Sequence, residues 1–131
     1  MASVRPLSIL IVDDNDRFRG TLSRFLSASG ILGTPWYATS GEQAIVAAVA
    51  NHPDVVLMDL SMPGMGGLEA TRRIKAIRPE QAVILLTAHD TSADRIRAEA
   101  AAADGFVSKS HVAEQLVGLI ASLRPGREVG V

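Results

Sequence analysis

Five short apolar runs, each followed by a helical pattern, constrain the fold of this chain more than any other feature. Three of the runs are continuous stretches of aliphatic and β-branched residues, which is typical of strands buried on both faces. Strands and helices in strict alternation predict a doubly wound α/β domain, a parallel sheet with helices on both faces. The predicted strands cover residues 7–12, 32–38, 55–59, 82–87 and 105–109.

Capping residues and apolar stripes indicate where the predicted helices begin and which faces they bury. Asn15 or Asp14 can cap the first helix, and Ser40 with Gln43 has the spacing of a capping box for the second. The run at 32–38 contains a glycine and a proline, which is typical of an edge strand. Thr91 or Ser92 and Ser110 are the candidate caps of the last two helices, and Ile96, Ala100 and Ala103 form the expected apolar stripe of the fourth.

Composition limits the classes of protein to which the chain can belong. With 131 residues and 47% hydrophobic residues, we expect one globular domain over residues 1–124, and a tail or the start of a linker over 125–131. The 13 basic and 14 acidic residues give no basic excess, so we expect no DNA binding by this segment alone. No apolar run approaches the roughly 20 residues that span a bilayer. We therefore expect no membrane association and a cytoplasmic location.

Four of the five predicted strands end in chemically reactive side chains. The carboxyl ends of parallel strands lie at one edge of a sheet, where ligands of open α/β sheets bind, so residues distant in sequence converge there. These residues are Asp13 and Asp14 after the first strand, Asp59 at the end of the third, Thr87 at the end of the fourth and Lys109 at the end of the fifth.

These residue types together favour phosphoryl chemistry. Three carboxylates brought together repel one another, so we expect a compensating cation, and oxygen ligands point to magnesium that keeps some of its waters. Magnesium, a lysine and a hydroxyl stabilise a phosphoryl group in transfer, and an aspartate among them can be the nucleophile. Taken singly, the Asp pair reads as a helix cap, the Thr as a strand residue and the Lys as a solvated strand end. Their joint placement at successive strand ends favours the phosphoryl site.

The chain resembles the receiver domain of bacterial two-component response regulators over about residues 7 to 123. The resemblance is carried by four motifs, Asp13-Asp14, Asp59-Leu60-Ser61-Met62-Pro63-Gly64, Leu86-Thr87-Ala88 and Phe106-Val107-Ser108-Lys109. It implies a flavodoxin-like (βα)5 sheet with strand order 2-1-3-4-5. Strands one and three would then flank the topological switch point, where ligands bind in such sheets.

The resemblance also implies a role for each matching residue. Asp59 would be the phosphoacceptor, and Asp14, Asp59 and the backbone carbonyl of Ser61 would bind magnesium directly, with Asp13 acting through bound water. Lys109 and Thr87 would contact the phosphoryl oxygens. Phe106 occupies the aromatic position whose rotamer follows phosphorylation, and Ser61 and His89 occupy two positions that tune the lifetime of the phosphorylated state.

The implied partners are a sensor histidine kinase or a phosphotransfer protein as the phosphoryl donor. The surface formed by the fourth helix, the fifth strand and the fifth helix would carry the signal, with a homodimer as a possible product of phosphorylation. Ser110 follows Lys109 where many receivers have Pro, as in regulators with a helix-turn-helix output domain. The chain is therefore expected to be a signalling module, and a candidate N-terminal part of a transcriptional regulator, rather than an enzyme.

Two other classes of protein use similar residues. A phosphatase of the haloacid dehalogenase type also combines an Asp nucleophile, a hydroxyl residue, a Lys and an acidic pair, but that family places its nucleophile on the first strand and its acidic pair late. Its nucleophile motif has a second aspartate two residues on, where this chain has Ser61. A degenerate receiver that only binds proteins is the other alternative, against which the intact acidic set argues.

Overall fold

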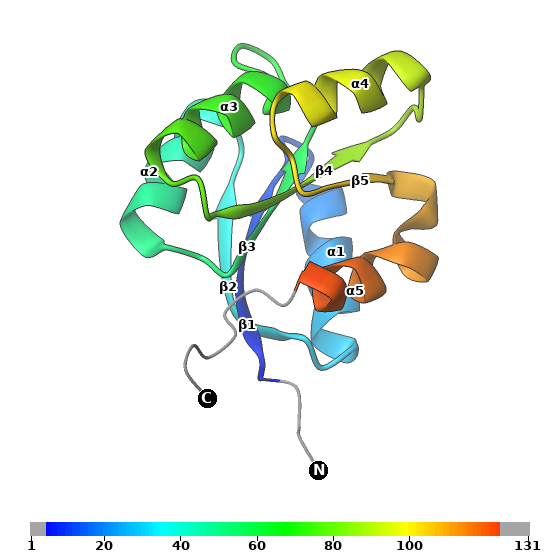
Figure 1. Cartoon of the computed structure of the whole chain (residues 1–131). Helices are drawn as coiled ribbons and strands as arrows, with labels where there is room; N and C mark the ends of the chain where they lie inside the picture. The colour runs from blue at the N-terminus through cyan, green and yellow to red at the C-terminus, as the bar shows by residue number, and fades with distance from the viewer. Residues whose placement is uncertain (1–4, 124–131) are drawn as a thin grey trace.

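The computed structural model describes residues 5–123, which form a five-stranded parallel sheet with helices on both faces (Figure 1). The sheet order is β2-β1-β3-β4-β5, as the resemblance implied. The strands are β1 (Leu7–Val12), β2 (Leu32–Ala38), β3 (Val55–Asp59), β4 (Ala82–Thr87) and β5 (Gly105–Ser108). The expected boundary at residue 124 and the tail at 125–131 lie outside the described residues.

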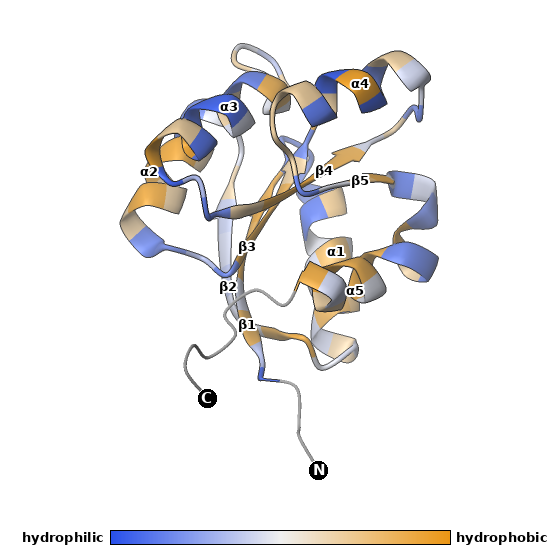
Figure 2. Ribbon diagram, in the orientation of Figure 1, coloured by the Kyte–Doolittle hydropathy of each residue, from blue (hydrophilic) through white to orange (hydrophobic). Residues whose placement is uncertain are grey.

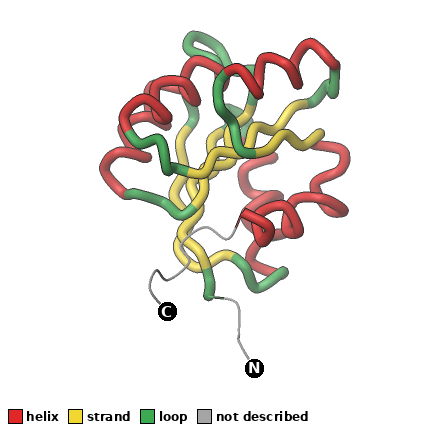
Figure 3. The backbone as a smooth tube through the Cα atoms, viewed as in Figure 1, coloured by secondary structure: helices red, strands yellow, loops and turns green. Residues whose placement is uncertain are grey.

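Helices follow each strand and cover the two faces of the sheet unequally (Figures 1 and 3). Helices α2, α3 and α4 cover one face, and α1 and α5 cover the other. The helices are α1 (Asp16–Ala28), α2 (Gly41–Asn51), α3 (Gly67–Ile77), α4 (Ser92–Ala100) and α5 (Val112–Leu123), with a 3-10 turn over Lys109–His111 before α5. None of the helices within residues 5–123 has the length and apolarity needed to cross a membrane.

Strand side chains alternate between two hydrophobic cores. Leu10, Val56 and Leu85 face α2, α3 and α4, whereas Ile9 and Leu57 face α1 and α5. Because the central strands are buried on both faces, their sequences are almost continuously apolar, as the hydropathy colouring of Figure 2 shows. The same burial fixes the register of β1 against β3, which brings their carboxyl ends together.

Most of the predicted caps are confirmed. The side chains of Asn15, Ser40 and Thr91 accept hydrogen bonds from backbone N–H groups in the first turns of α1, α2 and α4. The Ser110 cap is wrong: β5 ends at Ser108, and the Ser108 hydroxyl accepts the bond from the Ser110 N–H, at 3.3 Å. Lys109 therefore starts the 3-10 turn instead of ending the strand, because the chain turns one residue earlier than the sequence pattern indicated.

The predicted apolar stripe of α4 is also wrong in part. Ile96 is 66% exposed and Ala100 is exposed, whereas Ala98 is buried and Ala103 packs against the core. The prediction placed the largest apolar side chain against the sheet, but this short helix contacts the core through small residues. Ala102, in the left-handed region at φ +67°, ends this segment without the glycine that such a conformation favours.

Candidate functional site

The carboxylates predicted at the strand ends converge in the structure. Asp13 follows β1 directly and Asp59 ends β3, and these two strands pair with Val12 opposite Met58. One carboxylate oxygen from each of Asp13, Asp14 and Asp59 lies within 4.8 Å of the other two. The sequence placed these three residues at one edge of the sheet, and the register between β1 and β3 brings their side chains into one cluster.

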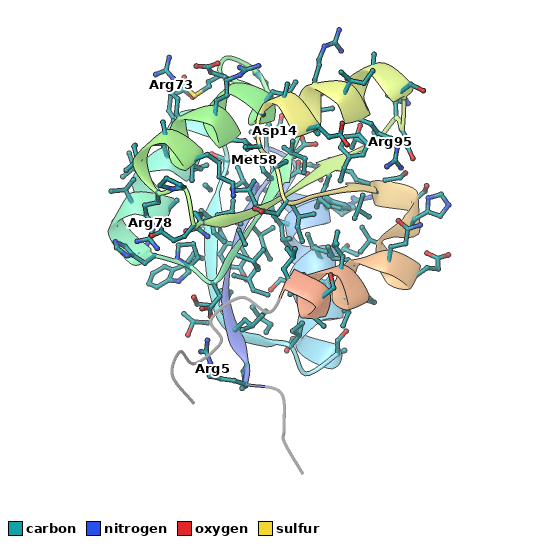
Figure 4. The ribbon with its side chains drawn as sticks, in the orientation of Figure 1. Arg5, Asp14, Met58, Arg73, Arg78 and Arg95 are labelled. Carbon is teal, nitrogen blue, oxygen red and sulfur yellow. The ribbon has the colours of Figure 1, made fainter. Side chains whose placement is uncertain are left out.

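The three carboxylates differ in their exposure to solvent. Asp13 is 1% exposed and Asp59 is 5% exposed, whereas Asp14 is exposed to solvent. Figure 4 labels Asp14 at the carboxyl end of the strands, near Met58 of β3 in this view. The cluster therefore has two buried oxygen donors and one donor on its open side, where water has access.

Two hydrogen bonds fix Asp13 at the start of α1. The Asn15 N–H donates a hydrogen bond of 2.9 Å to the Asp13 carboxylate, and the Arg19 guanidinium donates one of 2.6 Å to the Asp13 carbonyl oxygen. Asn15 also caps α1, so the acidic pair and the helix start are held by the same turn. Both interpretations of this segment therefore hold, for neighbouring residues: Asn15 caps the helix, and the two aspartates belong to the cluster.

Close packing of the loop after β3 holds the backbone of Asp59. The Leu60 N–H donates to the Leu86 carbonyl oxygen at 2.8 Å, and the Gly67 N–H donates to the Leu60 carbonyl oxygen at 3.0 Å. A Cβ atom on Gly67 would lie only 2.2 Å from the Asp59 carbonyl oxygen. Only glycine therefore fits at this position, and α3 begins directly against the strand end that carries Asp59.

Lys109, the first residue of the turn after β5, reaches the cluster with its ammonium group. Its Nζ lies 2.7 Å from Asp13 Oδ2 and 3.2 Å from Asp59 Oδ1. The same ammonium group lies 4.4 Å from the centroid of the Phe18 ring, a cation–π distance. From the sequence, the spacing of Phe18 to Leu22 and Leu26 predicts only that Phe18 belongs to the apolar stripe of the first helix. Its position one turn after the acidic pair is the signal that could have placed it near the site.

The electrostatics of the cluster favour binding of a cation. Burial raises the pKa of the Asp59 carboxyl, and the nearby Asp13 charge raises it further, against the opposing effects of Lys109 and the Ser61 N–H. Partial burial works against the charge of Lys109, but the hydrogen bond to Asp13 and the two carboxylate charges outweigh it, so the Lys109 pKa is raised. A charged Asp59 is therefore costly in the cluster as it stands, and a bound cation would reduce that cost.

The donor set fits magnesium. The three clustered side chains offer hard carboxylate oxygens, and the open side at Asp14 leaves room for the waters that magnesium retains. Within residues 5–123 no other group of three acidic or histidine side chains meets in this way. The cluster is thus consistent with the magnesium site that the sequence resemblance implied.

Thr87 lies at the end of β4, but its hydroxyl is engaged in its own loop. The Thr87 hydroxyl donates a hydrogen bond of 2.8 Å to the His89 carbonyl oxygen and accepts one of 3.1 Å from the His89 N–H. Thr87 is buried, whereas the His89 side chain is exposed. For the hydroxyl to reach a group on Asp59, the bond to the His89 carbonyl must break.

The two remaining predicted residues differ in their relation to the cluster. Phe106 is partly buried on β5, where it is paired with Leu85 and packs against the core under α4. Ser61 is exposed in the loop after β3, and its backbone N–H acts to lower the pKa of Asp59. Phe106 is therefore not a member of the charged cluster, whereas the Ser61 backbone affects the charge of Asp59.

Comparisons with known proteins agree with this arrangement. The model of the response regulator receiver domain family matches residues 9–121. Response regulator UvrY of Escherichia coli O6:H1 is 36% identical over 121 residues, which cover 92% of this chain and 56% of UvrY. Response regulator GacA of Pseudomonas aeruginosa is 35% identical over 121 residues, with the same coverage of both chains. The chain thus spans about half the length of the curated relatives that it matches.

A solved structure matches over most of both chains. It is a two-component response regulator of the LuxR family from Aurantimonas sp. SI85-9A1, with a TM-score of 0.86 and 31% sequence identity. The superposition covers 92% of this chain and 86% of that one. The similarity therefore extends over most of the fold of this chain.

Proposed function

This chain belongs to the response regulator receiver domain family, and from that membership we propose that Asp59 accepts a phosphoryl group from a histidine kinase or a phosphotransfer protein. The family implies a cognate histidine kinase as partner, and a receiver domain is not a conventional enzyme. The observation that carries the proposal is the position of Lys109, whose Nζ lies within 3.2 Å of carboxylate oxygens of both Asp13 and Asp59.

The proposed transfer uses groups that already lie at the strand ends. An oxygen of Asp59 attacks phosphorus, the bond from phosphorus to the donor's imidazole nitrogen breaks, and the nitrogen keeps the electron pair. Lys109 pairs with the phosphoryl oxygens, and Thr87 donates its hydroxyl to one of them after leaving the His89 carbonyl. In the separate hydrolysis to free phosphate, water attacks phosphorus, the Asp59 carboxylate leaves with the bonding pair, and the proton of the water passes to the phosphate or to solvent.

Magnesium is the proposed cofactor. Asp14, Asp59 and the Ser61 carbonyl oxygen would hold the ion directly, and Asp13 would hold it through water. When bound, magnesium neutralises the charge of the carboxylates and of the phosphoryl oxygens. The raised pKa of Asp59, which follows from burial and from Asp13, supports a need for this extra positive charge.

The proposed output is a change in the surface of α4, β5 and α5. Movement of Thr87 toward a phosphoryl group would vacate space next to β5, which the Phe106 ring could fill by changing its rotamer. A homodimer formed through the altered surface is one expected consequence. We further propose that the chain is the N-terminal part of a transcriptional regulator that acts in the cytoplasm. The greater length of the curated relatives and the match to a LuxR-family regulator support this proposal.

Labelling by a small phosphodonor tests the proposal. We expect acetyl phosphate with magnesium to add one base-labile phosphoryl group, detected as a mass shift of the intact protein. Asp59→Asn and chelation of magnesium should each abolish the shift. Asp16→Asn is the matched control, because Asp16 is an exposed acid of the α1 first turn that lies outside the cluster.

Two results would contradict the assignment. Undiminished labelling of the Asp59→Asn variant would place the phosphoryl group elsewhere. Absence of labelling by acetyl phosphate and by a cognate kinase, in protein that binds magnesium, would favour the degenerate receiver that acts only through protein binding. The phosphatase alternative conflicts with membership of the receiver family.

A further inference from the structure

Arg95 on α4 contacts two parts of the fold at once. Its Nε and Nη2 atoms donate hydrogen bonds of 2.8 and 2.7 Å to the two carboxylate oxygens of Asp90. Its guanidinium carbon lies 5.0 Å from the centroid of the Phe106 ring. Figure 4 labels Arg95 between α4 and the strands below it. The forked pairing holds the guanidinium plane in a fixed position, because both carboxylate oxygens are used.

Asp90 belongs to the loop that engages Thr87. The Thr87 hydroxyl is bonded to the carbonyl oxygen and the N–H of His89, the residue before Asp90. When Thr87 turns toward a phosphoryl group, both backbone partners on His89 are released. The carboxylate that positions Arg95 is therefore one residue away from the hydrogen bonds that the proposed switch must break.

A hollow lies next to this contact. It has a volume of about 280 Å³, lies between α4 and the start of β5, and is lined by Arg95 and Phe106, among others. An engineered cavity of about 150 Å³ accepts benzene, so a volume of this size leaves room for the side chains of this contact to move. Packing on this side therefore leaves free volume beside Phe106, and the contact with Arg95 is the interaction that restrains the ring there.

A second pair on the same helix shows what is particular about Arg95. Arg97 pairs with Asp94 through one contact of 3.1 Å, and its side chain is 61% exposed compared with 54% for Arg95. Among the described residues, no ring contact is found for Arg97. The two arginines thus share helix, charge and exposure, and differ in the forked pairing and in contact with Phe106.

We propose that Arg95 is a positioning residue, a latch held by Asp90 that keeps Phe106 in its present rotamer until the loop carrying Asp90 moves. The latch rests on the switch in the proposed function and names how it is regulated. When Thr87 leaves His89, Asp90 shifts, the forked pairing with Arg95 opens, and the Phe106 ring is free to turn into the space that Thr87 vacates next to β5. The latch therefore lowers the population of the active arrangement in unphosphorylated protein.

The test has two separate readouts, the position of the Phe106 ring and the binding of a phosphoryl analogue. With 4-fluorophenylalanine at position 106, fluorine NMR reports the two ring positions in the wild type, with and without magnesium and beryllium fluoride. Asp90→Asn removes the charge pairing and leaves Arg95 in place, and Arg95→Gln removes the guanidinium. Both variants should move the fluorine signal of analogue-free protein toward that of saturated wild type. Arg95→Lys keeps the charge but not the forked pairing, so its fluorine signal should lie between that of wild type and those of these two variants.

Affinity for beryllium fluoride gives the second readout. If the active arrangement is a minor population, apparent affinity rises with the fraction that is competent, so both variants should bind the analogue about three- to tenfold more tightly. Arg97→Gln and Asp94→Asn should match wild type in both measurements. Labelling of Asp59 by acetyl phosphate should persist in all of these variants, because none of the changed residues contacts the acidic cluster.

Wild-type values for Asp90→Asn and Arg95→Gln in both readouts would overturn the latch, as would weaker binding of the analogue. If these variants show wild-type values while Asp59 is still labelled, the result contradicts the latch alone. Failure of wild type to be labelled contradicts the proposed function instead. In that case the fluorine spectra of the analogue-free variants still decide whether Arg95 and Asp90 hold the Phe106 ring.

Discussion

The ammonium group of Lys109 lies 4.4 Å from the centroid of the Phe18 ring. This contact joins the first helix to the turn after β5, directly beside the acidic cluster. The ring face attracts the cation and limits the positions that the long lysine side chain can adopt. Phe18 thus contributes to the position of Lys109 between Asp13 and Asp59, a role that its place in an apolar stripe did not indicate.

We predict that Phe18→Leu slows labelling of Asp59 by acetyl phosphate about two- to fivefold. A cation–π contact at a partly exposed site is worth about 0.5–1 kcal/mol, and leucine keeps the apolar packing but lacks the ring face. Phe18→Tyr, which keeps the ring, is the control and should label at close to the wild-type rate. Equal rates for the Leu variant and wild type would mean that Phe18 only packs against the core.

We predict that Asp59→Asn raises the melting temperature of metal-free protein at neutral pH. Burial and the Asp13 charge raise the pKa of Asp59 above its ordinary value of 3.8, so the folded domain holds this proton more tightly than the unfolded chain. Stability is therefore lost as the pH rises from 3.8 through the folded pKa, and asparagine, which cannot ionise, avoids that loss. The difference between variant and wild type should shrink as the pH falls towards 3.8.

Thermal unfolding in a chelator across this pH range checks the preceding expectation. Lys109 keeps Asp13 as a partner at 2.7 Å in the variant, so the lysine is not left unpaired. Adding magnesium should raise the melting temperature of wild type more than that of the variant, because the ion binds the folded cluster. A variant that melts below wild type at neutral pH without metal would show that the Asp59 charge stabilises the fold.

We predict that Asp14→Ala weakens magnesium binding by about tenfold or more without unfolding the domain. Changing residues that merely support metal ligands costs about 10- to 100-fold in affinity, and Asp14 is proposed as a direct ligand. Asp14 is exposed and Asn15 provides the helix cap, so its loss removes no core contact. Titration calorimetry measures the affinity. Unchanged affinity would mean that Asp14 is not a ligand.

We predict that Ser61 and His89 set the lifetime of the phosphorylated state. Both residues are exposed, and each lies two residues past a proposed site residue, so we expect each to border the approach of water to Asp59. Replacing both, for example by Asn and Gln, should change the decay rate of the acyl phosphate while the extent of labelling at Asp59 stays the same. Rapid removal of phosphodonor followed by timed mass spectrometry gives the half-life, and an unaltered half-life would remove both residues from the site.

The strand ends could be predicted from sequence because the signals are local. A run such as 55–59 is apolar because it is buried on both faces, and its last residue, Asp59, stands out as a charge. The α4 stripe could not be predicted in this way. Periodicity indicates which residues share a helix face, but the sheet and the neighbouring helices decide which face is buried, and here Ala98 is buried while Ile96 is exposed.

The sequence by itself determined the order of strands and helices, and it placed the acidic pair, Asp59 and Thr87 at strand ends, because burial and capping depend on neighbouring residues. It placed Lys109 at the end of the fifth strand, one residue beyond the point at which that strand ends in the structure. Only the tertiary structure decided the side-chain contacts. The ring faces of Phe18 and Phe106 meet Lys109 and Arg95, which come from other elements. Long charged side chains have many rotamers, and the partners that select one of them are assembled only when the sheet and its helices pack together.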